Sequence, residues 1–122
     1  MAVEQQFTEG IQLFNARKYF EAHEALEAVW LKESGSRKTF LHGLIQVSAA
    51  FHHHMRNNPA GFQSLLRKGC SKINTFDGAY ADIDLAGLMR QLRLWQLSLL
   101  APGPGPTPPL PQIEWTKTHD RL

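Results

Sequence analysis

The sequence predicts an all-α protein with five helices. In five successive segments, apolar residues recur three and four positions apart, which is the period of an amphipathic helix. No segment alternates apolar and polar residues as a half-buried strand would. The stretches rich in glycine, proline and asparagine lie between these segments or near the C-terminal end, where they end helices.

The first two helices are expected over residues 3–16 and 19–32, with only a short break between them. A connection this short makes the pair an antiparallel hairpin. The spacing of small and apolar residues also fits a tetratricopeptide repeat, but a solenoid needs about three repeats and we find no three. The likeness therefore predicts tetratricopeptide-like packing and no peptide-binding array. The apolar stripe of the second helix comprises Tyr19, Ala22, Leu26, Val29 and Trp30.

The third and fourth helices form a second hairpin, over residues 37–56 and 59–76. Ser36 is expected to cap the third helix, and Pro59 suits the first turn of the fourth. His52 lies beside the apolar stripe of the third helix and should face the other helices. The residues expected to point inward are Phe40, Leu44, Val47, Phe51 and Met55, followed by Phe62, Leu65, Leu66, Gly69, Ile73 and Phe76.

The fifth helix is expected over residues 85–100, with Asp82 or Asp84 as its N-cap. Its inward positions are Leu88, Leu92, Trp95 and Leu99. Residues 102–111 are too rich in proline and glycine for a helix, so an extended tail follows. Ile113 and Trp115 then anchor this tail on the core, an interpretation we favour over binding of a proline-recognising partner. We expect a single helical domain over residues 1–100 and a docked tail over 101–122.

Length and composition are those of one ordinary globular domain, with 122 residues, 43% hydrophobic and 20% charged. The net charge of +2 is too small to indicate nucleic-acid binding, and Arg67, Lys68 and Lys72 are expected to form a solvated surface. No apolar run is long enough to cross a membrane, and the first residues lack a secretory signal. Cys70 is the only cysteine and should be inert and partly buried. With one cysteine no internal disulfide can form, and we expect a cytoplasmic protein.

One segment carries the candidate chemistry, the pattern His23-Glu24-x-x-Glu27 in the second helix. His23 and Glu27 are four residues apart and share a helix face. The pattern departs from the zinc-protease signature His-Glu-x-x-His because Glu27 replaces the second histidine. If His52 of the third helix converges on this face, the three side chains form a site for a divalent metal. Glu24 would then be the general base of a hydrolase.

Two other interpretations stay open for the same residues. A half-buried histidine beside a glutamate most often makes a structural hydrogen bond between helices, and we favour this interpretation for His23 and His52. Alternatively, Glu21, Gln46 and Trp30 are positions where a small ligand or a partner could be bound. The sequence assigns no cofactor beyond the divalent metal considered above, and it leaves a homodimer through the fifth helix open.

The segment from Tyr19 to Glu27 with Trp30, followed by Gly43-Leu44-Ile45-Gln46 and His52, resembles the family catalogued as domain of unknown function 309. The resemblance covers residues 7–73. It implies a small helical bundle with no established activity, whose characteristic polar positions are matched here by His23, Glu24, Glu27, Gln46 and His52.

The chain departs from that family at two positions. Arg17 stands where the family usually has a glycine between the first two helices, and His42 stands where it often has glutamine. If the backbone at Arg17 is left-handed, the side chain costs about 1 kcal/mol relative to glycine. The function expected overall is an uncharacterised helical domain whose His/Glu cluster is structural or binds a small ligand or partner, with a metal-dependent hydrolase as the alternative.

Overall fold

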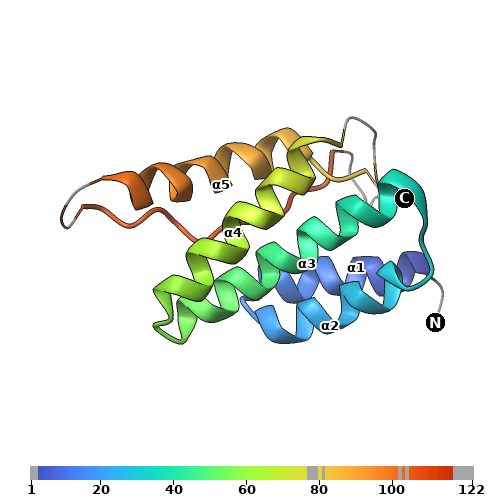
Figure 1. The fold of residues 1–122 in the computed structure, drawn as a ribbon. Coiled ribbons are helices and arrows are strands. Elements are labelled where there is room, and N and C mark those ends of the chain that lie inside the picture. Colours follow the sequence, from blue (N-terminus) through green and yellow to red (C-terminus); the bar gives the residue numbers. More distant parts are fainter. Residues whose placement is uncertain (1–2, 77–79, 81, 102, 104, 117–122) are drawn as a thin grey trace. The chain divides into compact units, whose positions relative to one another are not determined.

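The computed structural model describes residues 3–76, 80, 82–101, 103 and 105–116. Within these residues the only β pairing is an isolated bridge between Ile83 and Trp115, and the all-α prediction is confirmed. The chain forms two compact units, Met1–Asp77 and Gly78–Leu122. The helices, drawn in Figure 1, are α1 (Val3–Asn15), α2 (Tyr19–Trp30), α3 (Gly35–Met55), α4 (Pro59–Asn74) and α5 (Leu85–Leu100).

In the first unit α1 packs against α2, α2 against α3, and α3 against α4. α1 ends in a Schellman motif, in which the Lys18 amide donates to the Leu13 carbonyl at 2.9 Å and Arg17 has a φ of 66°. α3 ends in the same way, with Asn57 at a φ of 57°. The Asn58 side chain then caps α4 by accepting from the Gly61 amide at 3.2 Å. These local motifs explain why both interhelical connections are short.

The close packing of α3 on α4 depends on two facing glycines. A Cβ on Gly43 would lie 2.8 Å from Ile73 Cγ1 and 3.0 Å from the Gly69 carbonyl oxygen. A Cβ on Gly69 would lie 2.7 Å from Val47 Cγ2 and 2.8 Å from the Gly43 carbonyl oxygen. Real Cβ atoms do not approach backbone this closely, so the two helices meet at this separation only because both positions lack a side chain.

α2 and α3 run antiparallel, and two ring pairs fix their register. The Trp30 ring lies 5.8 Å from the His42 ring, and the Phe20 ring lies 5.5 Å from the His52 ring. The step of ten residues from Trp30 back to Phe20 in α2 therefore matches the step of ten residues from His42 forward to His52 in α3. In this register His23 faces Ala49, and the position facing Met55 precedes the first residue of α2.

The register explains one wrong prediction. Met55 was expected in the core but is 53% exposed, because it lies beyond the start of α2 and has no residue of that helix to cover it. Phe40, Leu44, Val47 and Phe51 are buried as predicted. Three other residues that were predicted to point inward are only half-buried, namely Trp30, Leu65 and Phe76. Leu99, also predicted to point inward, is exposed.

The helix ends differ slightly from the predicted ones. α3 begins at Gly35 with Ser34 as its N-cap, so the prediction of Ser36 is wrong. Two serines flank the glycine, and residue type alone does not choose between them. The Ser34 side chain makes no capping hydrogen bond. α2 ends at Trp30 and α4 at Asn74, each two residues earlier than predicted.

In the second unit Asp84 is the N-cap of α5, and its carboxylate accepts from the Gly87 amide at 2.9 Å. The Gln91 side chain makes a two-point contact with the backbone of Gln112, with both hydrogen bonds at 2.8 Å. The Trp95 indole donates to the Pro109 carbonyl at 2.9 Å. The described part of the proline-rich segment is therefore held along α5, while the grouping of residues 1–100 as one domain stays a prediction.

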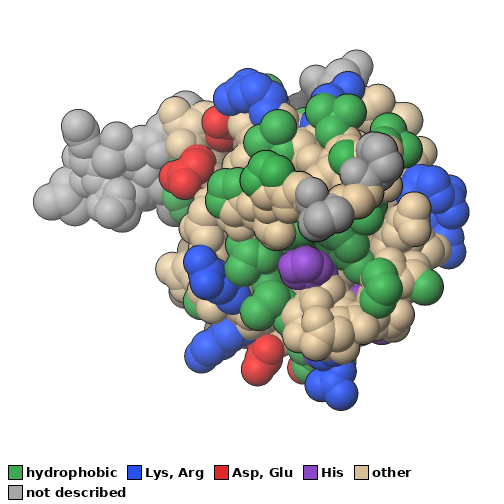
Figure 2. All heavy atoms as spheres, turned by 90° about the vertical axis from the view of Figure 1, so that its left-hand side faces the viewer, with side chains coloured by type: hydrophobic (Ala, Val, Ile, Leu, Met, Phe, Trp, Pro, Cys, Tyr) green, Lys and Arg blue, Asp and Glu red, His purple; other side chains and the backbone are tan. Residues whose placement is uncertain are grey.

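The surface is mixed in character. On the face shown in Figure 2, hydrophobic, histidine, and Lys and Arg side chains all reach the surface. No helix among the described residues combines the length and apolarity that crossing a membrane requires. Cys70 is buried, more fully than the partial burial that was predicted. Arg67 and Lys68 are exposed as expected, whereas Lys72 is half-buried.

Candidate functional site

Most of the predicted site residues line one cavity between α2 and α3, which we name the α2–α3 cavity. Its volume is about 250 Å³. α2 contributes His23, Glu27 and Trp30, which follow one another at helical spacing along a single face. The remaining lining residues are His42, Ile45, Gln46 and Ala49 of α3 and Leu65 of α4. Polar side chains from two helices therefore share this hollow.

Gln46 has a fixed orientation in the α2–α3 cavity. Lys72 Nζ donates to Gln46 Oε1 at 2.9 Å. Because a lysine ammonium has only donors, the contacted atom must be the amide oxygen, and the amide nitrogen keeps its two donors for other groups. The pKa of His42 is lowered, first by burial and then by the charge of Lys72. His42 is therefore a neutral imidazole near pH 7.

The other wall of the cavity is aromatic. Lys38 Nζ lies 4.4 Å from the centroid of the Trp30 ring, a cation–π contact, and the His42 ring lies beside the same indole. His23 Nδ1 is buried and has no hydrogen-bond partner among the described residues. The structural hydrogen bond that the sequence favours for His23 is thus not made through this atom.

The proposed metal ligands His23, Glu27 and His52 are not assembled into one cluster. Glu27 faces Ile45, and His52 lies seven residues further along α3, about 10 Å away along the axis. Two ligands of one metal must each lie about 2 Å from it. Accordingly, no group of three His, Cys, Asp or Glu side chains in the described part of the chain is placed to hold a metal ion.

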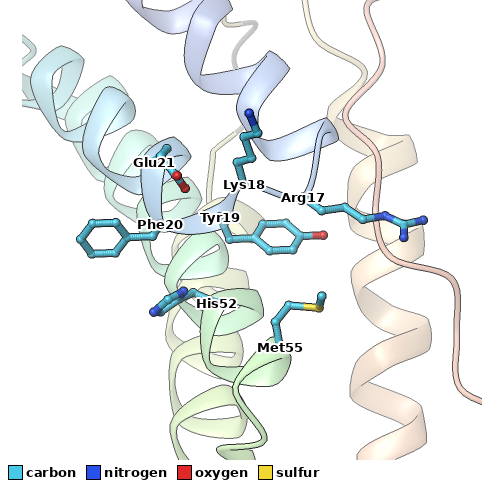
Figure 3. A pocket seen from close by; sticks show the side chains of 7 residues that line it. All are labelled: Arg17, Lys18, Tyr19, Phe20, Glu21, His52 and Met55. Carbon is cyan, nitrogen blue, oxygen red and sulfur yellow. The ribbon is translucent and has the colours of Figure 1, made fainter.

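His52 and Glu21 line a second cavity, at the turn between α1 and α2, with a volume of about 390 Å³ (Figure 3). We name it the turn cavity. Phe20 lies between the two sites, with its ring 6.0 Å from the His23 ring and 5.5 Å from the His52 ring. The full set of lining residues is Arg17, Lys18, Tyr19, Phe20, Glu21, His52 and Met55.

Two ionisable groups in the turn cavity have shifted pKa values. Burial lowers the pKa of His52, and the charges of Arg56, His53 and His23 lower it further, against a smaller opposing effect of Glu21. Burial raises the pKa of Tyr19, although the nearby charge of Arg17 acts in the opposite direction. The imidazole is therefore neutral near pH 7 and the phenol keeps its proton, which makes Tyr19 a hydrogen-bond donor.

The predicted site residues thus fall into three groups. His23, Glu27, Trp30 and Gln46 line the α2–α3 cavity. Glu21 and His52 line the turn cavity. Glu24, the predicted general base, is exposed and lines neither cavity.

Sequence reasoning missed the contribution of His42, Lys38 and Lys72 to the α2–α3 cavity. A signal existed for His42, which is four residues before Gln46 and shares its helix face. For the two lysines there was none, because their contacts with Trp30 and Gln46 depend on how the helices pack.

Comparison with known proteins identifies the segment that carries both cavities. Residues 7–65 match the family model described as domain of unknown function (DUF309). This confirms the resemblance that the two motifs indicated, and every residue that lines either cavity lies inside this DUF309 segment. Lys72, which orients Gln46, lies outside it.

One curated relative matches a longer part of the chain. The uncharacterized protein YpuF of Bacillus subtilis (strain 168) is 33% identical over 76 residues, which is 62% of this chain. The match spans 44% of the length of YpuF. The chain therefore covers less than half of that relative, and neither the DUF309 family description nor the relative's name assigns an activity.

Proposed function

We propose that this protein binds a small, uncharged, planar polar molecule in the α2–α3 cavity. The observation that carries the proposal is the shared hollow in which Glu27, an oriented Gln46 and an indole wall meet. A carboxylate acceptor and an amide donor on facing helices recognise a ligand edge that presents both a donor and an acceptor. The indole and the imidazoles favour a flat ring or amide plane.

The charges around the cavity support a neutral ligand. Lys38 lies over the Trp30 ring and Lys72 donates to the Gln46 oxygen, so positive charges flank the cavity that Glu27 lines with a negative charge. His42 is neutral near pH 7 because its pKa is lowered. A strongly anionic ligand would meet the Glu27 carboxylate, and a strongly cationic one would meet the two lysines.

The size of the cavity limits the ligand. At about 250 Å³ it is smaller than the roughly 300–1,000 Å³ typical of pockets for drug-sized molecules. A single heterocyclic ring system or a small aromatic amide would fill it. His23, which also lines the cavity, has an unpartnered Nδ1 that could serve as one further hydrogen-bonding atom.

The sequence also left a metal-dependent hydrolase open. That function would require His23, Glu27 and His52 to share an ion with Glu24 beside it, and no three-ligand group among the described residues supports such a centre. Binding without a metal is therefore the function that we propose.

A test compares two glutamates of the same helix. A panel of neutral heterocycles and aromatic amides is screened by ¹H–¹⁵N NMR, and we expect a hit to shift amides of α2 and α3 around the cavity. Glu27→Gln and Gln46→Leu should each weaken binding about fivefold, since the first weakens and the second removes a hydrogen bond with a net value of roughly 1 kcal/mol.

The matched control is Glu24→Gln, which changes an exposed carboxylate that does not line the cavity. It should bind the hit as the unaltered protein does. The proposal fails if no compound of the panel shifts these amides. It also fails if Glu24→Gln weakens binding as much as Glu27→Gln.

A further inference from the structure

The turn cavity contains a feature that the proposed function does not use, the buried hydroxyl group of Tyr19. Tyr19 is only 2% exposed, and its hydroxyl group has no hydrogen-bond partner among the described residues. Its ring is held by packing, with the Phe14 ring at 5.2 Å edge-on and the Phe51 ring at 5.7 Å. A buried hydroxyl that lacks an acceptor costs free energy, which a ligand supplying that acceptor would recover.

A fixed positive charge lies at the same end of the cavity. Figure 3 shows that the Tyr19 phenol and the Arg17 side chain extend in the same direction, and that Phe20 points the opposite way. The Arg17 guanidinium is close enough to act electrostatically on the phenol. Two donors, one of them permanently charged, therefore converge at one end of the hollow.

The start of α2 adds to this positive character. The cavity is lined by Lys18 and by the first three residues of α2. Lys18 occupies the N-cap position and makes no side-chain capping hydrogen bond. The first-turn N–H groups of a helix have no intrahelical partner, and the helix dipole makes this end favourable for negative charge.

The rest of the turn cavity is largely apolar. Phe20 is 48% exposed and Met55 is 53% exposed, and both line the hollow. Figure 3 places Met55 below the phenol and His52 between Phe20 and Met55. Glu21 lies on the Phe20 side, away from Arg17. The cavity therefore has an oxyanion-binding end and an apolar end.

We propose that the turn cavity is a second binding site, which takes an organic oxyanion with a short apolar group. The carboxylate or phosphate group accepts hydrogen bonds from Tyr19 and Arg17, and the apolar group lies against Met55 and Phe20. Arg17 and Met55 are exposed side chains and can move aside to admit the oxyanion to the phenol. Carboxylates and phosphate monoesters share this chemistry.

The experiment uses four probes on the full chain, namely hexanoate, hexyl phosphate, inorganic phosphate and hexanol. Binding is followed by the NMR shifts of the Phe20, Glu21 and His52 amides. We expect one or both of the amphiphilic anions to bind at least tenfold more tightly than inorganic phosphate or hexanol. A preference between hexanoate and hexyl phosphate identifies the class of oxyanion.

Three variants test the residues. Tyr19→Phe removes only the hydroxyl group, and Arg17→Gln removes the charge. Each should weaken binding of the preferred anion at least fivefold. Arg67→Gln removes an exposed arginine that lines neither cavity and should leave binding unchanged.

Two outcomes overturn the proposal. In the first, all four probes bind equally or none binds. In the second, Tyr19→Phe and Arg17→Gln bind as well as Arg67→Gln. A circular-dichroism melt of each variant separates lost binding from lost folding, and Tyr19→Phe keeps the packed ring and so remains informative if Arg17→Gln perturbs the turn.

Discussion

Arg17 occupies a backbone conformation that suits glycine better. Its φ of 66° lies in the left-handed region, where a Cβ costs roughly 1–2 kcal/mol. The Schellman motif at the end of α1 imposes this conformation on whichever residue follows the helix by two positions. The backbone at Arg17 is therefore left-handed, which is the condition under which a cost relative to glycine was expected.

We expect Arg17→Gly to raise the free energy of unfolding by about 1 kcal/mol, because glycine relieves the left-handed strain at some cost in chain entropy. Urea denaturation measures the change. Arg17→Ala is the control, since it removes the guanidinium but keeps a Cβ, and it should give no such gain. Equal stabilisation by both variants would mean that the charge and not the backbone is responsible.

His42 makes stability depend on pH. Its pKa is lowered in the folded protein, so the unfolded chain binds the proton more readily. The contribution of His42 to the free energy of unfolding is therefore fully present above the unfolded pKa of about 6.5, and it is lost as the pH falls below that value.

We expect the melting temperature of the protein to fall between about pH 7 and pH 5, and His42→Gln to reduce that fall. Glutamine keeps a polar side chain in the cavity but does not titrate. Melts by circular dichroism across this range, with His53→Gln as the control, measure the difference. His53 is a neighbouring histidine of α3 that lines neither cavity, and its replacement is the matched comparison. An identical slope in all three proteins would refute the assignment to His42.

Among the helices, the close contact between α3 and α4 depends on two positions that have no side chain. Gly43 and Gly69 face each other, and each would direct a Cβ onto the backbone carbonyl of the other. Backbone atoms cannot move aside as the end of a flexible side chain can. The contact is therefore sensitive to a single methyl group.

We expect Gly69→Ala to lower the free energy of unfolding by about 1–2 kcal/mol. The steric cost of overpacking exceeds the roughly 1 kcal/mol that alanine gains in helix propensity. Chemical denaturation of this variant is compared with that of Gly105→Ala, where an added Cβ has no atom within 4 Å. A stabilised Gly69→Ala protein would show that the helices separate freely at this crossing.

At the scale of the whole molecule, the chain forms two compact units, and both candidate sites belong to the first. That unit contains four helices, the Schellman motifs between them and its own set of buried aromatic and aliphatic residues. The second unit holds α5 and the segment paired with it through Gln91 and Trp95.

We expect a fragment of residues 1–77 to fold by itself, because its helices pack against one another in sequence and its turns are closed locally. Circular dichroism and a thermal melt test this, with the full chain as the reference. A helical spectrum with a cooperative transition is expected. A broad, non-cooperative melt would instead support residues 1–100 as the smallest folding domain.

The sequence alone determined the helices and much of their capping, because these depend on residues close together in the chain. The spacing of apolar residues located all five helices, Asp84 was one of the two residues expected to cap α5, and His23 and Glu27 were placed on one face of α2. Ser34 and Ser36 could not be distinguished, since a shift of the start by two residues changes little locally.

Only the tertiary structure decided which face of α3 meets that face of α2. His52 and the pair His42 and Gln46 lie on different faces of α3, and either face could have been directed at His23 and Glu27. The rotation and register of α3 are fixed by packing between residues far apart in the sequence, including Gly43 against Gly69. This packing places His42 and Gln46 in the α2–α3 cavity and His52 in the turn cavity, because a helix side chain's position depends on the whole helix's rotation and translation.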